Sequence, residues 1–188
     1  MKIVIIRHGK SRIETSGRLG ASDFGAWVSD YNEAGIDENH QPSTIAIERA
    51  KSCEFIVCSN LLRSIESANL LEIEKPDLIS PVFRECEMPY GNFKYPKFSI
   101  SVWSLIFRLF QLSGYSPNAE SYKEIKERSK ECASQLADLA RNHGSVIFVG
   151  HGALNWLLHK NLLGMGWSGP MKSAKNHWGF SEYKYNET

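Results

Sequence analysis

Short apolar runs and longer amphipathic stretches alternate along this chain. The run at 2–6 is rich in β-branched residues and apolar on both faces, as is typical of a strand buried in a parallel sheet. Similar short runs at 54–58, 78–82 and 145–149 predict further strands, and the alternating pattern at 178–185 predicts a final one. We therefore expect a β-sheet whose first strand lies in the core.

Amphipathic helices are predicted between these strands. Ser43 and Ser59 are suitable N-cap residues for the helices that follow them. The longest stretch repeats its apolar residues with a period of about 3.6, as a helix packed on one face does. The predicted helices span 43–51, 59–72, 119–142 and 153–163. Alternation of strands and helices predicts an α/β fold with a mostly parallel sheet covered on both faces.

Two segments do not fit this alternation. Residues 11–42 are rich in Gly, Ser, Asp and Asn with little periodicity, which predicts a loop containing a short helix near Trp27. Residues 88–117 are rich in aromatic residues and include a helical stripe, formed by Trp103, Phe107 and Phe110. We expect this second segment to be a small cap insertion within a single domain that spans residues 1–188.

Composition narrows the possible partners. The 188 residues are 42% hydrophobic and 23% charged, with a formal net charge of +1, so no global field favours nucleic acid or an anionic membrane. No segment reaches the roughly 18 apolar residues of a membrane span, and the N-terminal run is too short for a secretory signal. The four cysteines show no C-x-x-C spacing and are expected to be reduced. We expect a cytoplasmic protein that binds neither nucleic acid nor membranes; its oligomeric state stays open.

Candidate chemistry lies at the ends of the predicted strands. Two strands end in nearly the same way, with Arg-His-Gly at 7–9 and Gly-His-Gly at 150–152. Ligands bind at the carboxyl ends of strands in open α/β sheets, so both imidazoles are expected in one crevice. Arg63 follows the second predicted strand, and the third is followed by Glu85 and Glu87. Since both carboxylates have the same parity, either could point into the crevice, and we favour Glu85.

These residue types suit phosphoryl transfer through a covalent intermediate. A neutral imidazole can attack phosphorus, and guanidinium groups can neutralise the phosphoryl oxygens in a bidentate manner. A carboxylic acid can protonate the leaving oxygen. The glycines after each histidine allow the backbone to approach a ligand closely. No spacing in the sequence indicates a metal site, and we expect no cofactor.

Four segments in this order resemble the histidine phosphatase superfamily, also called phosphoglycerate mutase-like. They are Arg7-His8-Gly9, Ser59-Asn-Leu-Leu-Arg63-Ser-Ile-Glu-Ser-Ala68, the Arg84-Glu85 pair, and Gly150-His151-Gly152, and the resemblance runs from Arg7 to about Leu158. An Arg-His-Gly triplet alone is weak, but four ordered segments that each follow a predicted strand are specific. The resemblance implies a three-layer α/β/α sandwich and a step that requires no metal.

The resemblance also implies roles for individual residues. His8 would be the phosphorylated nucleophile, with Arg7, Arg63 and His151 around the phosphate, and Glu85 would be the general acid and later the base that activates water. Substrate contacts are further expected from Gly9, Lys10, Ser11 and Gly152. Two positions depart from the family pattern: Lys10 replaces the usual Glu or Gln, and Glu14 stands where many members have a phosphate-contacting Asn.

The expected function is hydrolysis of a phosphomonoester through a phosphohistidine intermediate. The substrate would be a small phosphorylated metabolite or a phosphorylated side chain. Two alternatives stay open: a phosphomutase, which returns the group to a second hydroxyl, and a non-catalytic phosphate-binding adaptor that uses the aromatic stripe as a partner face. The short predicted cap favours hydrolysis, because it leaves little material to exclude water. The four remaining histidines, His40, His143, His159 and His177, have no surrounding motif and are expected at the surface or in packing contacts.

Overall fold

A computed structural model describes residues 1–186 and divides the chain into two compact units. The sheet unit comprises residues 1–11, 35–85 and those from 128 onward, and the helical unit comprises 12–34 and 86–127. The insertion predicted at 88–117 falls within the helical unit, together with the segment 12–34. The description of the whole chain as a single domain stays a prediction.

The sheet unit is built on five strands in the order β3-β2-β4-β1-β5. All neighbouring pairs are parallel except β1 with β5, so the sheet is mostly parallel, as predicted. The strands are β1 (Lys2–Arg7), β2 (Phe55–Cys58), β3 (Leu78–Ile79), β4 (Ser145–Gly150) and β5 (Phe180–Lys184). In the central pair Arg7 aligns with Gly150, which brings the two histidine-containing strand ends to the same edge of the sheet.

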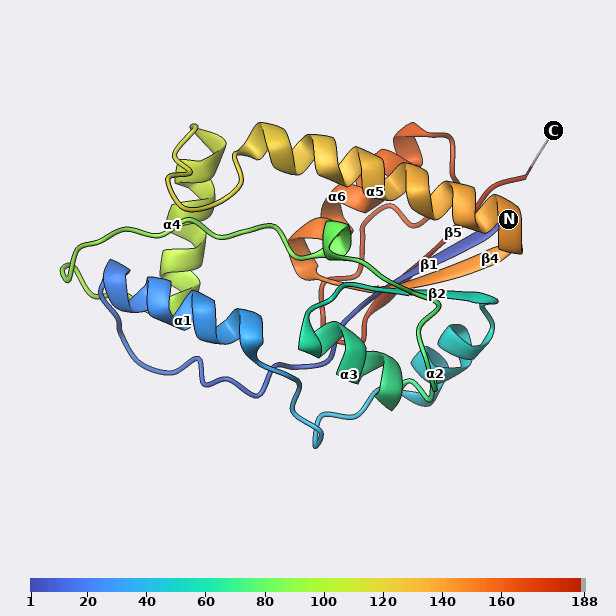
Figure 1. The fold of residues 1–188 in the computed structure, drawn as a ribbon, viewed down its shortest axis with the longest axis horizontal. Helices are drawn as coiled ribbons and strands as arrows, with labels where there is room; N and C mark the ends of the chain where they lie inside the picture. Colours follow the sequence, from blue (N-terminus) through green and yellow to red (C-terminus); the bar gives the residue numbers. More distant parts are fainter. Residues whose placement is uncertain (187–188) are drawn as a thin grey trace. The chain divides into compact units, whose positions relative to one another are not determined.

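Helices cover both faces of this sheet, giving the three-layer α/β/α arrangement (Figure 1). One face carries α2 (Thr44–Lys51) and α3 (Leu62–Leu70), and the other carries α5 (Tyr122–His143) and α6 (Gly152–Gly164). Alternate residues of β1 and β4 supply the two cores, because side chains of a strand point to opposite faces. Beneath α2 and α3 a continuous apolar cluster includes Val4, Ile6, Ala46, Ala50, Ala68, Leu71, Ile147 and Val149.

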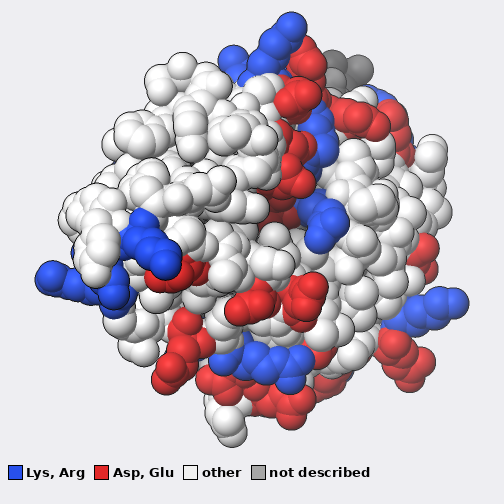
Figure 2. Space-filling view, turned by 60° about the vertical axis from the view of Figure 1, so that its left-hand side comes forward, with Lys and Arg blue, Asp and Glu red and all other residues white. Residues whose placement is uncertain are grey.

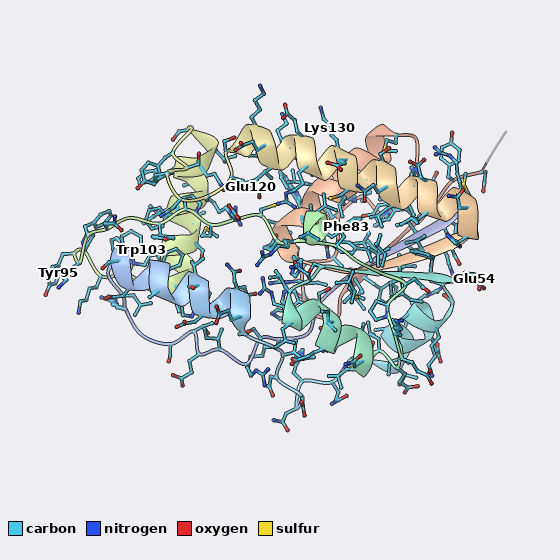
Figure 3. All side chains as sticks on the ribbon, in the orientation of Figure 1. Glu54, Phe83, Tyr95, Trp103, Glu120 and Lys130 are labelled. Atoms are coloured by element: carbon cyan, nitrogen blue, oxygen red, sulfur yellow. The ribbon has the colours of Figure 1, made fainter. Side chains whose placement is uncertain are left out.

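Two predicted boundaries in the sheet unit were wrong. The helix expected from Ser59 begins at Leu62. Leu61 is its N-cap residue and has an extended backbone, so Ser59 lies outside the helix. The strand expected at 78–82 ends at Ile79 and is followed by a 3₁₀ turn, Pro81–Phe83. Proline has no N–H to donate to a sheet ladder, which explains why the strand stops there. Phe83, labelled in Figure 3, lies in that turn. Its ring packs against Phe148, with ring centroids 5.1 Å apart.

The helical unit contains α1 (Ala21–Glu33) and α4 (Ile100–Leu112) around an aromatic core. Phe24 of α1 stacks on Phe107 of α4 at a centroid distance of 5.6 Å. The indole N–H of Trp103, which is labelled in Figure 3, donates to the Leu19 carbonyl at 2.7 Å. The helical stripe expected within 88–117 lies on α4, where Trp103 and Phe107 are buried but Phe110 is 48% exposed. Helix α1 is 13 residues long, much longer than the short helix expected near Trp27.

The described surface is mixed in charge. On the face drawn in Figure 2, acidic and basic side chains are interspersed among uncharged areas, in keeping with the net charge of +1. Within residues 1–186, no helix is both long and apolar enough to cross a membrane. The four cysteines are buried as free thiols.

Candidate active site

Backbone pairing of β1 with β4 places the two glycine-flanked histidines side by side. The His8 N–H continues the ladder and donates to the Gly150 carbonyl at 3.0 Å. The imidazole centroids of His8 and His151 are 5.2 Å apart. Both side chains are almost completely buried, at 1% and 0% exposure. The structure therefore brings together the two imidazoles that the sequence pattern placed in one crevice.

The His8 ring is held in one tautomer by its own turn. Its Nδ1 lies 2.7 Å from the Gly9 carbonyl oxygen. Because a carbonyl can only accept, Nδ1 carries the proton, and the lone pair of the neutral ring is on Nε2. Burial holds the pKa of His8 well below its ordinary value of 6.5, and the neighbouring His151 and Arg63 lower this pKa further. At neutral pH His8 is thus an uncharged imidazole with a nucleophilic Nε2.

The second imidazole is fixed by β2 and by its own helix. His151 Nε2 lies 2.7 Å from the Ser59 hydroxyl oxygen, and the His151 backbone N–H donates to Asn155 Oδ1 at 3.1 Å. The pKa of His151 is also well below 6.5, first through burial and then through four arginines: Arg63, Arg7, Arg128 and Arg84. Its Nδ1 is buried and has no hydrogen-bond partner among residues 1–186.

Two arginines provide the positive charge nearest the imidazoles. The Arg63 side chain, in the first turn of α3, is fully buried, and its charge lowers the pKa of both His8 and His151. Arg7 donates from Nη1 to the Lys175 carbonyl at 2.5 Å, whereas its buried Nε has no partner in the described part of the chain. A Cβ at Gly152 would lie 3.4 Å from Arg7 Cζ, so the first residue of α6 is in contact range of this guanidinium. Both arginines therefore contribute positive potential at the two rings, which suits an anion.

Glu85 is bound at the N-terminus of α6. Its two carboxylate oxygens accept hydrogen bonds from the backbone N–H groups of Ala153 at 3.1 Å and Leu154 at 3.0 Å. These groups belong to the first turn of the helix, whose N–H groups have no partner within the helix and favour negative charge. Glu87 instead accepts the N–H of Glu120 at 2.9 Å, within the helical unit. The two carboxylates that the sequence left as alternatives therefore have different surroundings, and Glu85 is joined to the helix that begins after His151.

The other predicted contact residues lie in the turn that follows β1. Gly9 donates its N–H to Ser67 Oγ at 2.9 Å. Ser11 is buried, and its hydroxyl donates to the Gly35 carbonyl at 3.2 Å. Lys10 is exposed, and its backbone carbonyl accepts the Asp37 N–H at 2.7 Å. These three residues therefore hydrogen-bond within the sheet unit, through the backbone of Gly9 and Lys10 and through the hydroxyl of Ser11. Direct contact of any of them with a substrate stays a prediction.

The position of Glu14, the second departure from the family pattern, lies in the helical unit. Its carbonyl accepts the indole N–H of Trp27 at 3.0 Å.

Sequence reasoning missed the contribution of the segment before β5. His177 was expected at the surface or in packing, but its ring centroid lies 5.4 Å from that of His8, and its Nδ1 donates to the His8 carbonyl at 2.9 Å. Trp178 donates its backbone N–H to the Arg7 carbonyl at 3.0 Å and its indole N–H to the His40 carbonyl at 2.7 Å. These residues are about 170 positions from His8 in the chain, and no local motif marks them. Asn155, four residues after His151, accepts the His151 backbone N–H, and the sequence did not indicate this role either.

The described part of the chain contains no metal-ligand cluster. Within residues 1–186, no group of three or more His, Cys, Asp or Glu side chains is arranged to hold a metal ion.

Comparisons with known proteins place the chain in a family. The family model of the histidine phosphatase superfamily (branch 1) matches residues 3–188. The chain belongs to this superfamily. A comparison with curated proteins finds no match to the sequence.

Solved structures share the fold at low sequence identity. One is a mycobacterial glucosyl-3-phosphoglycerate phosphatase in complex with VO3, with 18% identity and a TM-score of 0.60 over 96% of this chain and 91% of that one. Another is a variant of phosphoserine phosphatase from Entamoeba histolytica in complex with phosphoserine, with 18% identity and a TM-score of 0.59 over 98% and 91%. At this level of identity the similarity establishes the fold.

Proposed function

We propose that this protein hydrolyses phosphomonoesters through a phosphohistidine at His8. The observation that carries the proposal is a buried, neutral imidazole whose Nε2 lone pair is available while positive charge surrounds it. A neutral nucleophile next to fixed cations is what attack on a phosphate dianion requires, since the cations attract the substrate without protonating the nucleophile. Membership of the histidine phosphatase superfamily supports the same reaction class.

The first half of the reaction transfers the phosphoryl group to His8. The Nε2 lone pair forms the N–P bond as the bond between phosphorus and the ester oxygen breaks. Arg7 and Arg63 neutralise the charge on the non-bridging oxygens. A proton from the carboxylic acid of Glu85 goes to the departing alkoxide, which leaves as an alcohol.

The second half returns the enzyme to its starting state. The Glu85 carboxylate accepts a proton from water, the water oxygen attacks phosphorus, and the N–P bond breaks with its electron pair returning to Nε2. The products are inorganic phosphate and the neutral imidazole. Glu85 accepts hydrogen bonds from two backbone N–H groups in the structure, and hydrogen bonds of this kind would stabilise the carboxylate at this step.

The proposed substrate is a phosphate ester of a small metabolite or of an amino-acid side chain. The two structural relatives are named for glucosyl-3-phosphoglycerate and phosphoserine, which are both phosphate esters of alcohols. A basic alkoxide leaving group requires protonation, and this requirement fits the proposed acid. These names support the class of substrate and do not select one compound.

A phosphate-release screen tests the proposal. Sugar phosphates, nucleotides, phosphoamino acids and an aryl phosphate are incubated with the protein in the presence of a chelator, and His8→Ala is compared with the unchanged chain. Loss of the nucleophile is expected to lower the rate by at least roughly 10³-fold. His143→Ala is the matched control, because His143 stacks on Phe55 at a centroid distance of 4.3 Å and takes no part in the site.

Three results would contradict this function. Equal rates for His8→Ala and the unchanged chain would rule out the phosphohistidine mechanism. Absence of phosphate release from every ester, combined with tight phosphate binding, would favour the adaptor alternative. Transfer of labelled phosphate between two hydroxyls of one substrate, faster than its release, would instead identify a mutase.

A further inference from the structure

The Ser59 hydroxyl lies between a backbone donor and His151. Ser59 is fully buried at the end of β2, and its Oγ lies 2.7 Å from His151 Nε2. The same oxygen accepts a hydrogen bond from the Leu61 N–H at 3.3 Å. Because the helix starts at Leu62, Ser59 does not act as the N-cap that the sequence predicted. Its hydroxyl is therefore directed to the imidazole.

Proton accounting favours one direction for this hydrogen bond. If Nε2–H donated to Ser59, the hydroxyl proton would need another acceptor, and none is found for it within residues 1–186. The buried Nδ1 lone pair of His151 would then also lack a donor. If the hydroxyl instead donates to Nε2, only Nδ1–H is left without a partner. Since each buried polar group without a partner costs about 1–3 kcal/mol, the second arrangement is preferred.

We propose that Ser59 is a positioning residue that fixes His151 as the Nδ1–H tautomer, so that Nδ1–H donates to a phosphoryl oxygen of the substrate. The opposite tautomer would present a lone pair to an anion, which is repulsive. The burial that lowers the pKa of His151 keeps the ring neutral, so its tautomer decides whether it attracts or repels phosphate. The inference rests on the proposed phosphoryl chemistry, because it supplies the acceptor for Nδ1–H.

The tautomer is measured directly by NMR. In ¹⁵N-labelled protein, two-bond correlations between the ring nitrogens and the carbon-bound ring protons distinguish Nδ1–H from Nε2–H in each histidine. The His151 signals are assigned by their loss in His151→Gln. We expect a single Nδ1–H tautomer in the unchanged chain, a shift toward a mixture in Ser59→Ala, and retention of Nδ1–H in Ser59→Thr, which keeps a hydroxyl. Orthovanadate, added as a phosphate mimic, is expected to shift the Nδ1 resonance of the unchanged chain.

Affinity for orthovanadate provides a second readout that does not require turnover. Ser59→Ala is expected to bind it about 10- to 100-fold more weakly, as for the loss of a hydrogen bond to a charged group. Ser129→Ala is the matched control. Ser129 is also a buried serine, and its hydroxyl accepts a hydrogen bond from Asn161 Nδ2 at 3.0 Å, on helices rather than at the strand ends. The control is expected to leave both the tautomer and the affinity unchanged.

The outcomes separate this inference from the proposed function. An Nε2–H tautomer in the unchanged chain would overturn the inference, whatever the activity and even if Ser59→Ala did not fold. An unchanged tautomer in folded Ser59→Ala would overturn it as well. If no ester is hydrolysed, but the Nδ1–H tautomer and the Ser59-dependent vanadate affinity are observed, the proposed function fails and the role of Ser59 in anion binding stands.

Discussion

Replacing Gly9 by alanine is expected to destabilise the protein and to disturb the nucleophile. A Cβ on residue 9 would lie 2.4 Å from Cζ2 of Trp178, about 1 Å inside the 3.4 Å at which ordinary van der Waals contact begins. The indole cannot easily move away, because it is 7% exposed and its N–H donates to the His40 carbonyl at 2.7 Å. The turn at 8–9 must therefore shift, and the Gly9 carbonyl that holds His8 Nδ1 shifts with it.

The size of this effect follows from the cost of overpacking. Inserting a methyl group into a well-packed site typically costs about 1–3 kcal/mol. For a chain of this length each kcal/mol lowers the melting temperature by about 2–4 °C, so a decrease of about 2–12 °C is expected. In the proposed reaction kcat should fall more than affinity for phosphate, since the displaced group is the nucleophile rather than the arginines.

Thermal unfolding and steady-state kinetics on four variants test this reasoning. Gly164→Ala is the control, because a Cβ at Gly164 meets no atom within 4 Å. Trp178→Phe removes the ring atoms that the new methyl would contact, so Gly9→Ala should cost clearly less in that background than in the unchanged chain. Equal costs in the two backgrounds would refute the proposed contact with the indole.

Three further predictions concern pH, metals and the acid. The pKa values of His8 and His151 lie well below 6.5 in the folded protein, so below about pH 6.5 the unfolded chain binds more protons than the folded one. The free energy of unfolding therefore decreases as pH falls, by about 1.4 kcal/mol per pH unit for each histidine. Urea unfolding between pH 7 and 5 measures this decrease, and a free energy of unfolding that does not change with pH would contradict the prediction. Phosphatase activity should survive excess chelator, because guanidinium groups neutralise the phosphate; loss that Mg²⁺ or Zn²⁺ restores would reveal a metal site. Glu85→Gln should slow hydrolysis of alkyl phosphates by about 10²- to 10⁴-fold and of aryl phosphates far less, since an aryl oxide leaves without protonation. If Glu87→Gln shows this selectivity and Glu85→Gln does not, Glu87 is the general acid.

The sheet could be predicted because its signals are local. Each apolar run, that of β1 and that of β4, is followed directly by a glycine-flanked histidine. Because the two strands are parallel, both histidines lie at the carboxyl edge of the sheet, where ligands bind in such folds. Helix α1 could not be predicted in the same way. It contains Gly25 in its interior and begins after Gly20, which offers no side-chain cap. At Gly25 a Cβ would lie 2.5 Å from the Tyr90 ring, so this glycine is explained by packing within the helical unit and not by helix propensity.

The sequence could not predict the residues that support the site but are far from it along the chain. His177 and Trp178 bind the backbone of Arg7 and His8 through contacts that depend on β5 pairing with β1 in antiparallel register. Trp178 also has a positive φ of 61°, an uncommon conformation for a bulky residue. Its backbone N–H and its indole are both hydrogen-bonded, which explains how the surrounding structure maintains that conformation.

Glu85 and Glu87 have different surroundings in the structure, and strand parity could not predict this difference. Two residues of equal parity are equivalent to a pattern, but only Glu85 accepts hydrogen bonds from the first turn of α6. That helix begins directly after His151, and its first residue, Gly152, is in contact range of Arg7. The N-terminus of one helix therefore binds the proposed acid, follows the second imidazole directly and lies close to one arginine. Because proton transfer and charge neutralisation must occur on the same phosphate, this shared support provides the preorganisation that the proposed reaction requires.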